Sequence, residues 1–255
     1  MISRYFRPRG RHWDPAWDLI IDEQTIGFQG RHKDKLHIAF KDSGDGFQAD
    51  DVCDCGYTYS FIYSNYDIPD SKHYLCATSE RVIWLLKRLK IECNHAYMDS
   101  LYNNVKLYRA AYAEKKLLYG VARTHGQGVA EAIIQQEVKS KKKQDEVRGE
   151  VKLAVMKGDA TCPDVLACSL YDTKPVHIIS TVADNIKWTP INKKFYIKIE
   201  KKSVDMTFHC LNVIHIFTFG MVSVDEGDQL RMQYRPDHWM RNRKSWWSIF
   251  LWGLG

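Results

Sequence analysis

A strand, a helix and a second strand follow one another in residues 95–122, and this order restricts the fold class of the chain. The segment reads HAYMDSLYNNVKLYRAAYAEKKLLYGVA. Its apolar residues predict a short strand that ends at Asp99, a helix over residues 105–116 and a further strand near Leu118. A strand, a helix and a strand in succession favour a mixed α/β sheet.

The residues before this segment predict four more strands and one more helix. The run AWDLIIDEQTIGFQG indicates a strand that carries the acidic pair Asp22 and Glu23 near its end. KLHIAFKD, FQADDVCD and YTYSFIYSN are rich in β-formers and are separated by turn residues, so they predict three antiparallel strands in a meander. TSERVIWLLKRLK has the apolar period of a helix, with Ser79 as its N-cap.

The second half of the chain is mainly strand-like. GEVKLAVMKG, DVLACSLYD, PVHIISTVA and FYIKIEKK each predict a strand. We therefore predict four parts: a basic N-terminal arm over residues 1–14, an α/β core over 15–130, a mainly β insertion over 131–212, and a segment over 213–255 that ends in a helix. Because the sequence stops on the apolar run WWSIFLWGLG without a cap or tail, we expect a longer protein that has been truncated.

Composition limits the partners of the chain. With 37 Lys and Arg against 31 Asp and Glu, the formal net charge is +6, a mild bias that permits nucleic acid as a partner. The seven cysteines have no repeated CxxC spacing, which supports neither a disulfide framework nor a structural zinc site and fits a reducing, intracellular compartment. The longest apolar stretches, such as VIHIFTFGMV, are too short to span a bilayer, so we expect a soluble protein without membrane contact.

Three aspartates stand where a metal ion could be held. Asp22 follows LII in the first predicted strand, Asp99 ends the strand HAYMD, and Asp225 lies in VSVDEGDQL. Carboxylates at strand ends are common ligands of Mg2+ and Mn2+. If Asp225 begins a helix, Asp228 lies one turn later on the same face. Since most of the 31 acidic residues must be solvated, position alone does not separate a ligand from a surface carboxylate.

Four blocks of sequence carry a further pattern. The block IDEQTIGFQGRHKDKLHIAFKDSGDGFQADDVCDCGYTYSFIYS has an Asp-Glu pair, Phe-x-Gly-Arg and a CD…GY strand pair. HAYMDSLYNNVKLYRAAYAEKKLLYGVARTHGQGV has an Asp and a helix that leads into a Gly-x-x-Arg turn, VLACSLYDTKPVHIISTV is a strand pair, and MVSVDEGDQLRMQY holds a third Asp. In this order, over residues 18–252, the blocks resemble the piggyBac family of transposases.

The resemblance implies an α/β, ribonuclease H-like mixed sheet with flanking helices, interrupted by the mainly β insertion. It implies that Asp22, Asp99 and Asp225 are catalytic and hold two Mg2+ or Mn2+ ions, with Asp228 as an accessory catalytic acid. The chemistry would be two-metal cleavage and strand transfer of DNA. From the resemblance we expect this chain to lack the family's upstream dimerisation and DNA-binding region and its downstream zinc-binding tail.

Double-stranded DNA, as transposon ends and as target, is the partner that the resemblance implies. No small-molecule substrate is expected, a homodimer is allowed, and a nuclear location follows from the DNA substrate. The residues predicted to contact DNA are basic and follow the three acid blocks. They are Arg31, Lys33, Lys35, Arg123, Arg231, Arg235, Arg241, Arg243 and Lys244.

One departure from the family pattern leaves two interpretations open. Val222 and Ser223 stand where the family has Gly-Gly before the third aspartate, which affects the backbone that presents Asp225. The chain is therefore either an active, metal-dependent DNA transposase or a catalytically inactive, transposase-derived protein that binds DNA or another partner. A third interpretation is an unrelated α/β binding protein whose blocks match by chance. Metal-dependent nicking of DNA separates the first two.

Overall fold

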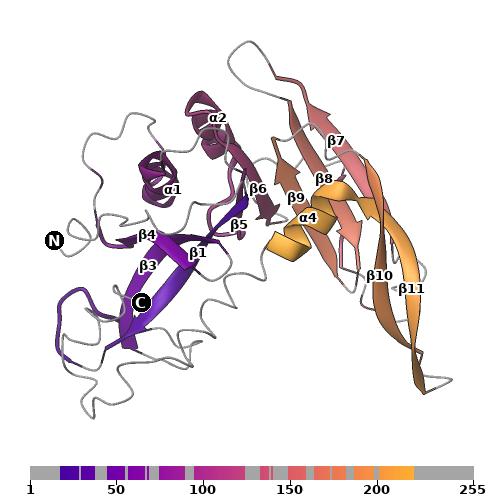
Figure 1. The fold of residues 1–255 in the computed structure, drawn as a ribbon, viewed down its shortest axis with the longest axis horizontal. Helices are drawn as coiled ribbons and strands as arrows, with labels where there is room; N and C mark the ends of the chain where they lie inside the picture. The colour runs from indigo at the N-terminus through magenta and orange to yellow at the C-terminus, as the bar shows by residue number, and fades with distance from the viewer. Residues whose placement is uncertain are drawn as a thin grey trace. The chain divides into compact units, whose positions relative to one another are not determined.

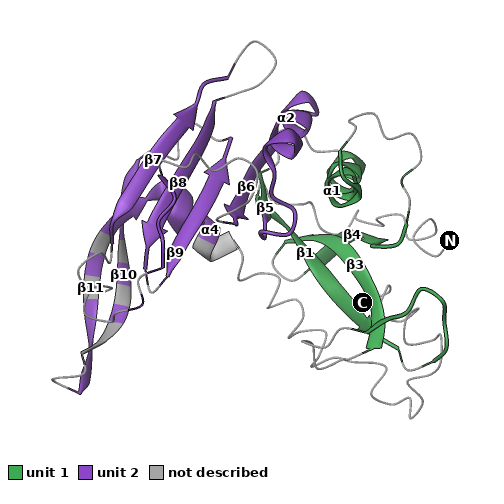
Figure 2. Ribbon diagram, turned by 180° about the vertical axis from the view of Figure 1, so that it is seen from behind, with its two compact units in different colours: residues 1–97, 221–255 green, residues 98–220 purple. Residues whose placement is uncertain are grey.

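The computed structural model shows strands and helices in two compact units. The described residues are 18–28, 30–37, 45–54, 57–66, 68, 75–89, 95–123, 133–137, 139, 149–158, 164–172, 174–181, 187–197 and 201–220. The predicted arm over 1–14 and the predicted C-terminal helix lie outside these residues. The chain divides into two compact units, residues 1–97 with 221–255 and residues 98–220, which are coloured separately in Figure 2.

In the first unit, three strands pair with the strand over residues 45–54. The strands of this unit are β1 (Asp18–Gly27), β2 (Leu36–His37), β3 (Asp45–Asp54), β4 (Tyr57–Tyr63) and β5 (His95–Met98). β1 and β4 pair antiparallel with opposite edges of β3 (Figure 1). β2 also pairs antiparallel with β3, on the edge opposite to β1. The predicted antiparallel strands are confirmed, but they do not form a meander with β3 between β2 and β4, because β1 occupies the edge that a meander would need.

β1 corrects the predicted position of the acidic pair. The strand runs on to Gly27, so Asp22 and Glu23 lie in its middle and not near its end. The extension follows from apolar packing, because Ile26 continues the pairing with β3 and joins a buried cluster. The other members of the cluster are Phe28, Phe47, Ala49 and Phe61.

Helix α1 (Ala77–Arg88) confirms the helix predicted from TSERVIWLLKRLK, and it packs against β3 and β4. Val82, Ile83, Leu85 and Leu86 supply its buried face. The predicted N-cap is wrong: the cap residue is Cys76 in extended conformation, and Ser79 is a buried residue inside the first turn. The Glu80 carboxylate instead accepts a hydrogen bond from the Leu75 backbone N–H, at 3.0 Å.

The second unit contains the predicted helix and strand that follow Asp99. Helix α2 (Val105–Ala113) is capped by Asn104, whose side chain accepts from the Leu107 backbone N–H, and strand β6 (Leu117–Ala122) follows the helix. The helix ends three residues before the predicted position because Lys115 has a positive φ of 58°. β6 pairs antiparallel with β9 (Pro175–Ser180), β9 with β8 (Val165–Tyr171), and β8 with β7 (Val151–Met156).

A separate hairpin and a helix complete the second unit. β10 (Trp188–Ile197) and β11 (Lys202–Leu211) form a two-stranded sheet, so FYIKIEKK is not one strand but spans the turn between two. Lys201 occupies the turn with a φ of 47°. The apolar run after β11 forms helix α4 (Asn212–Gly220), which contacts β6, β9, β10 and β11. None of the described helices is long and apolar enough to cross a membrane. The predicted mixed α/β class, rich in strands with flanking helices, is confirmed.

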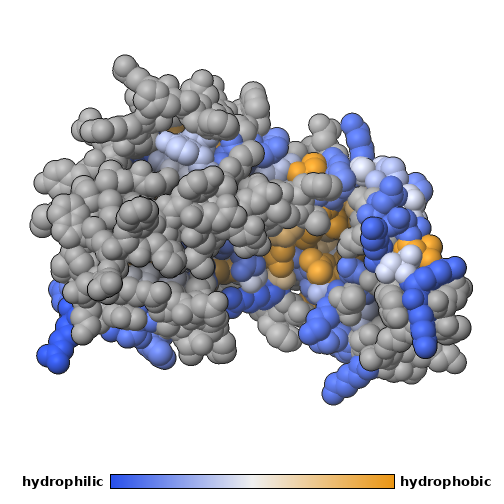
Figure 3. Space-filling model, turned by 60° about the horizontal axis from the view of Figure 1, so that its bottom comes forward, coloured by the Kyte–Doolittle hydropathy of each residue, from blue (hydrophilic) through white to orange (hydrophobic). Residues whose placement is uncertain are grey.

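Some apolar side chains of both units remain at the surface. Figure 3 shows apolar patches between hydrophilic side chains. Three of the exposed apolar residues, Leu153, Val155 and Met156, belong to β7, which ends the strand order β6-β9-β8-β7. Because little apolar surface of β7 is buried, hydrophobic stabilisation of this end strand is small.

A buried polar network fastens residues 133–137 to the sheet of the second unit. The Ser169 hydroxyl donates to Gln135 Oε1 at 2.9 Å, and the Gln135 backbone N–H donates to His177 Nε2 at 3.2 Å. The Gln135 side-chain amide donates to the backbone carbonyl of Glu150 at 3.3 Å. His177 must be neutral to accept at Nε2, and burial lowers the pKa of His177 below its usual value.

The protein should therefore lose stability in mild acid through His177. An unfolded histidine has a pKa near about 6.5. Because the folded pKa is lower, the unfolded chain binds the proton first, so the contribution of His177 is complete above that value and is lost as the pH falls toward the folded pKa. Thermal unfolding between neutral pH and mild acid, compared for the wild type and His177→Gln, measures it. The variant keeps an acceptor without titrating, so an equally steep decline in both proteins would contradict the assignment.

Candidate functional site

Asp22 lies in the middle of β1, half-buried, and its Oδ1 accepts from the backbone N–H of Glu23 at 2.8 Å. Its partner across the antiparallel pair is Asp51 of β3. Directly opposed residues of an antiparallel pair project from the same face of the sheet. Asp51 is fully buried and accepts from the Thr58 hydroxyl at 3.3 Å. A second carboxylate therefore shares the face of Asp22, which sequence reasoning missed because only the strand register brings the two together.

The neighbouring acids occupy the opposite face of the same strands. Glu23 is paired in register with Asp50, and the Gln48 side chain donates to Glu23 Oε2 at 2.8 Å. The Arg81 guanidinium of α1 forms a hydrogen-bonded ion pair with Asp50, and the side chains of these two residues are 9% and 2% exposed. Arg81 also donates to the Thr78 hydroxyl at 3.3 Å. Asp50 is therefore a structural acid that neutralises a helix residue.

Asp99 follows the last residue of β5 and is exposed. Its Oδ1 accepts from the backbone N–H of Ser100, and its carbonyl oxygen accepts from the Tyr102 N–H at 3.2 Å. Asp99 thus opens the short turn that leads to α2. Arg123, directly after β6, donates through Nε to the Ser100 hydroxyl at 3.4 Å, so one residue of the predicted DNA-binding set lies beside the second predicted acid.

The four predicted catalytic acids are not all described. Asp22 belongs to the first unit and Asp99 to the second, and Asp225 and Asp228 lie outside the described residues. Within the described part of the chain, no three His, Cys, Asp or Glu side chains are grouped to hold a metal ion. The donor chemistry nevertheless suits the predicted ions, because Asp22 and Asp99 offer carboxylate oxygens, the ligands that Mg2+ and Mn2+ prefer.

The predicted DNA-binding residues differ in their surroundings. Arg31 and Lys33, between β1 and β2, are exposed. Lys35 is partly buried and its Nζ lies 2.6 Å from Asp45 Oδ2. Basic residues that are exposed can reach a phosphate, whereas one in a close ion pair must first leave its partner. The other predicted residues lie outside the described part of the chain; they are Arg231, Arg235, Arg241, Arg243 and Lys244.

Comparison with known proteins adds two findings. The family model of Transposase IS4 matches residues 1–254. Among solved structures, the chain is similar to a piggyBac transposase in a cryo-EM structure of its synaptic complex with hairpin DNA, with a TM-score of 0.69 and 18% identity over 94% of this chain and 45% of that one. The chain thus spans less than half the length of that transposase. This likeness confirms the predicted ribonuclease H-like fold. No curated protein matches the sequence.

Proposed function

The chain belongs to the Transposase IS4 family, and we propose from this that it is the catalytic core of a piggyBac-like transposase, which cleaves and joins double-stranded DNA. The match of the family model over residues 1–254 is the observation that carries the proposal. The solved piggyBac transposase with the same fold was captured with hairpin DNA, which supports DNA as the substrate class. A nuclear location and a homodimer belong to the proposal on the family resemblance alone.

Asp22, Asp99 and Asp225 are the proposed ligands of two Mg2+ or Mn2+ ions, and Asp228 is the proposed accessory acid. Bound there, such ions supply Lewis-acid activation of water and of the leaving oxygen. The chain orients two of the carboxylates through backbone N–H groups, from Glu23 to Asp22 and from Ser100 to Asp99. The ionised form of a carboxylate is the form that binds a cation.

Phosphate contacts are proposed for basic groups near these acids. Arg123 is exposed and is hydrogen-bonded to Ser100, the residue after Asp99, so it can bring positive charge to a DNA backbone close to a reacting phosphate. Arg31 and Lys33 follow β1, the strand of Asp22, and are also exposed. The net charge of +6 agrees with a polyanionic partner.

A nicking assay tests the proposal. Supercoiled plasmid is incubated with the purified chain and Mn2+, Mg2+, Ca2+ or EDTA, and nicked circles are separated on a gel. Nicking with Mn2+ or Mg2+ that EDTA abolishes is expected. A plasmid without transposon ends is the right substrate, because the test then does not depend on recognition of those ends.

A catalytically inactive DNA-binding protein is the second candidate, and Val222 and Ser223 before Asp225 favour it. A chain that binds plasmid in a gel-shift experiment but never nicks it with any of these ions would establish this second function. A chain that neither binds nor nicks DNA would overturn both candidates.

A further inference from the structure

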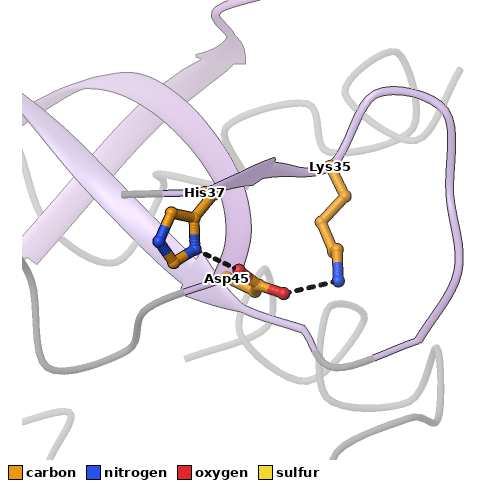
Figure 4. A network of polar contacts seen from close by, with 3 residues as sticks. All are labelled: Lys35, His37 and Asp45. Carbon is orange, nitrogen blue, oxygen red and sulfur yellow. Dashed lines mark hydrogen bonds and ion pairs between the residues drawn. The ribbon is translucent and has the colours of Figure 1, made fainter. Parts of the chain in front are cut away.

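Asp45 joins two basic side chains at the start of β3. Its Oδ2 lies 2.6 Å from Lys35 Nζ, and its Oδ1 lies 2.6 Å from His37 Nδ1, as Figure 4 shows. His37 and Asp45 are also directly opposite each other in the pairing of β2 with β3. The hydrogen bond from Lys35, which has the larger effect, and the hydrogen bond from His37 lower the pKa of Asp45, so its carboxylate is ionised at neutral pH. We call these three residues the Asp45 clasp.

The clasp closes a segment, residues 30–37, that is also held along its length. Gly30 lies so close to the buried Phe28 ring that a Cβ there would stand 2.3 Å from Phe28 Cζ. The ring of His32 packs edge-on against Phe47, with 5.3 Å between centroids. The His32 carbonyl accepts from the Lys35 backbone N–H at 3.3 Å, which closes a turn at the tip. β2 itself has only two residues, so side-chain contacts must supply much of the hold on this segment.

The basic residues of this segment are of two kinds: Lys35 is ion-paired, whereas Arg31 and Lys33 are exposed. The Lys35 side chain is 23% exposed and its charge is compensated by Asp45. Arg31 and Lys33 are exposed, and no ion pair to either is present within the described part of the chain. A phosphate that approached Lys35 would meet the negative charge of Asp45 and would have to displace it. A phosphate that approached Lys33 would displace no ion-pair partner among the described residues, because the neighbouring carboxylate of Asp34 lies against His32 Nδ1, at 3.8 Å.

We propose that Asp45 uses Lys35 and His37 as a structural clasp between β2 and β3, so that this segment meets a DNA backbone through Arg31 and Lys33 and not through Lys35. The inference rests on the proposed DNA substrate, and it removes Lys35 from the residues that contact phosphate. It also gives Asp45 a function of its own: its carboxylate compensates the Lys35 charge, so removing that carboxylate would free this charge and let DNA bind more tightly.

DNA binding measured at a series of salt concentrations tests this difference between Lys33 and Lys35. Fluorescence anisotropy of a labelled, mixed-sequence duplex gives the slope of log affinity against log salt concentration, which reports the number of phosphates contacted. Lys33→Met should flatten the slope by about one. Lys35→Met, the matched change two residues away, should leave the slope nearly as in the wild type. Asp45→Asn should raise the affinity and steepen the slope by up to about one, because it releases the Lys35 charge.

Thermal unfolding tests the clasp without DNA. Lys35→Met should lower Tm by about 1–3 °C, and Lys33→Met should leave it unchanged. Equal flattening of the salt slope by both lysine variants, with equal Tm values, would overturn the inference while leaving DNA binding intact. A wild-type chain that binds no duplex at all would overturn the DNA-contact part together with the proposed function, whereas the Tm difference would still report the clasp.

Discussion

Replacing Asp22 with asparagine is expected to lower metal-dependent nicking of DNA about a thousandfold, since the ions it would help to hold contribute several kcal/mol of transition-state stabilisation. The change is nearly isosteric, and the amide oxygen can still accept from the Glu23 N–H. What is lost is the negative charge that a divalent cation requires. Plasmid nicking rates in Mn2+ measure the effect.

Asp18 of the same strand provides the matched control. Its carboxylate accepts from the Tyr97 hydroxyl at 3.0 Å and lies 3.1 Å from His95 Nδ1, and it is not a predicted ligand. Asp18→Asn should nick as the wild type does, and Mn2+ should raise its Tm as much as it raises that of the wild type. Asp22→Asn should lose most of the Mn2+-induced rise. Undiminished nicking by Asp22→Asn would rule Asp22 out as a ligand.

Replacing Arg81 with methionine should lower the free energy of unfolding by about 3–5 kcal/mol, the largest stability effect that we expect from a single substitution. The Asp50 side chain is 2% exposed, so loss of the guanidinium leaves a carboxylate that is buried without this partner. Methionine keeps the length of the aliphatic stem, which limits the change to the charge and its hydrogen bonds. Urea unfolding measures the difference.

A double variant separates the ion pair from the packing. Asp50→Leu combined with Arg81→Met removes both charges, and most of the lost stability should return, because two apolar side chains of similar volume can replace a buried pair. Lys87→Met, an exposed position on the same helix, should change the free energy of unfolding by no more than about 0.5 kcal/mol. If the double variant were as unstable as Arg81→Met alone, the loss would come from packing and not from the missing ion pair of Asp50 with Arg81.

The elements that the sequence predicts well are those whose signal is local. The apolar period of Val82, Ile83, Leu85 and Leu86 is enough to predict α1, and the strand, helix and strand after residue 94 are confirmed within a few residues. The errors concern local details with tertiary causes. Ser79 has the chemistry of an N-cap, but burial of the first turn places it inside the helix.

The arrangement of strands could not be predicted in the same way. The meander failed because β1 pairs with β3 and takes the edge that a meander would need. β11 was missed although Val204, Met206, Phe208 and Cys210 alternate with polar residues, which is the period of a strand. The same limit applies to the site. Asp22 and Asp99 follow from the family resemblance, whereas the closeness of Asp51 to Asp22 and the clasp around Asp45 depend on register between strands.

That register also decides which acid is presented. A slip of β1 by one residue against β3 would turn every side chain of the strand to the other face and would put Glu23 where Asp22 stands. The same slip would take Ile26 away from Phe47, its partner in the buried cluster. Apolar packing around Ile26 therefore decides whether Asp22 or Glu23, a few residues away in the same strand, occupies the face proposed for chemistry. Substitutions in the buried cluster can thus abolish the proposed DNA cleavage although they change no proposed metal ligand.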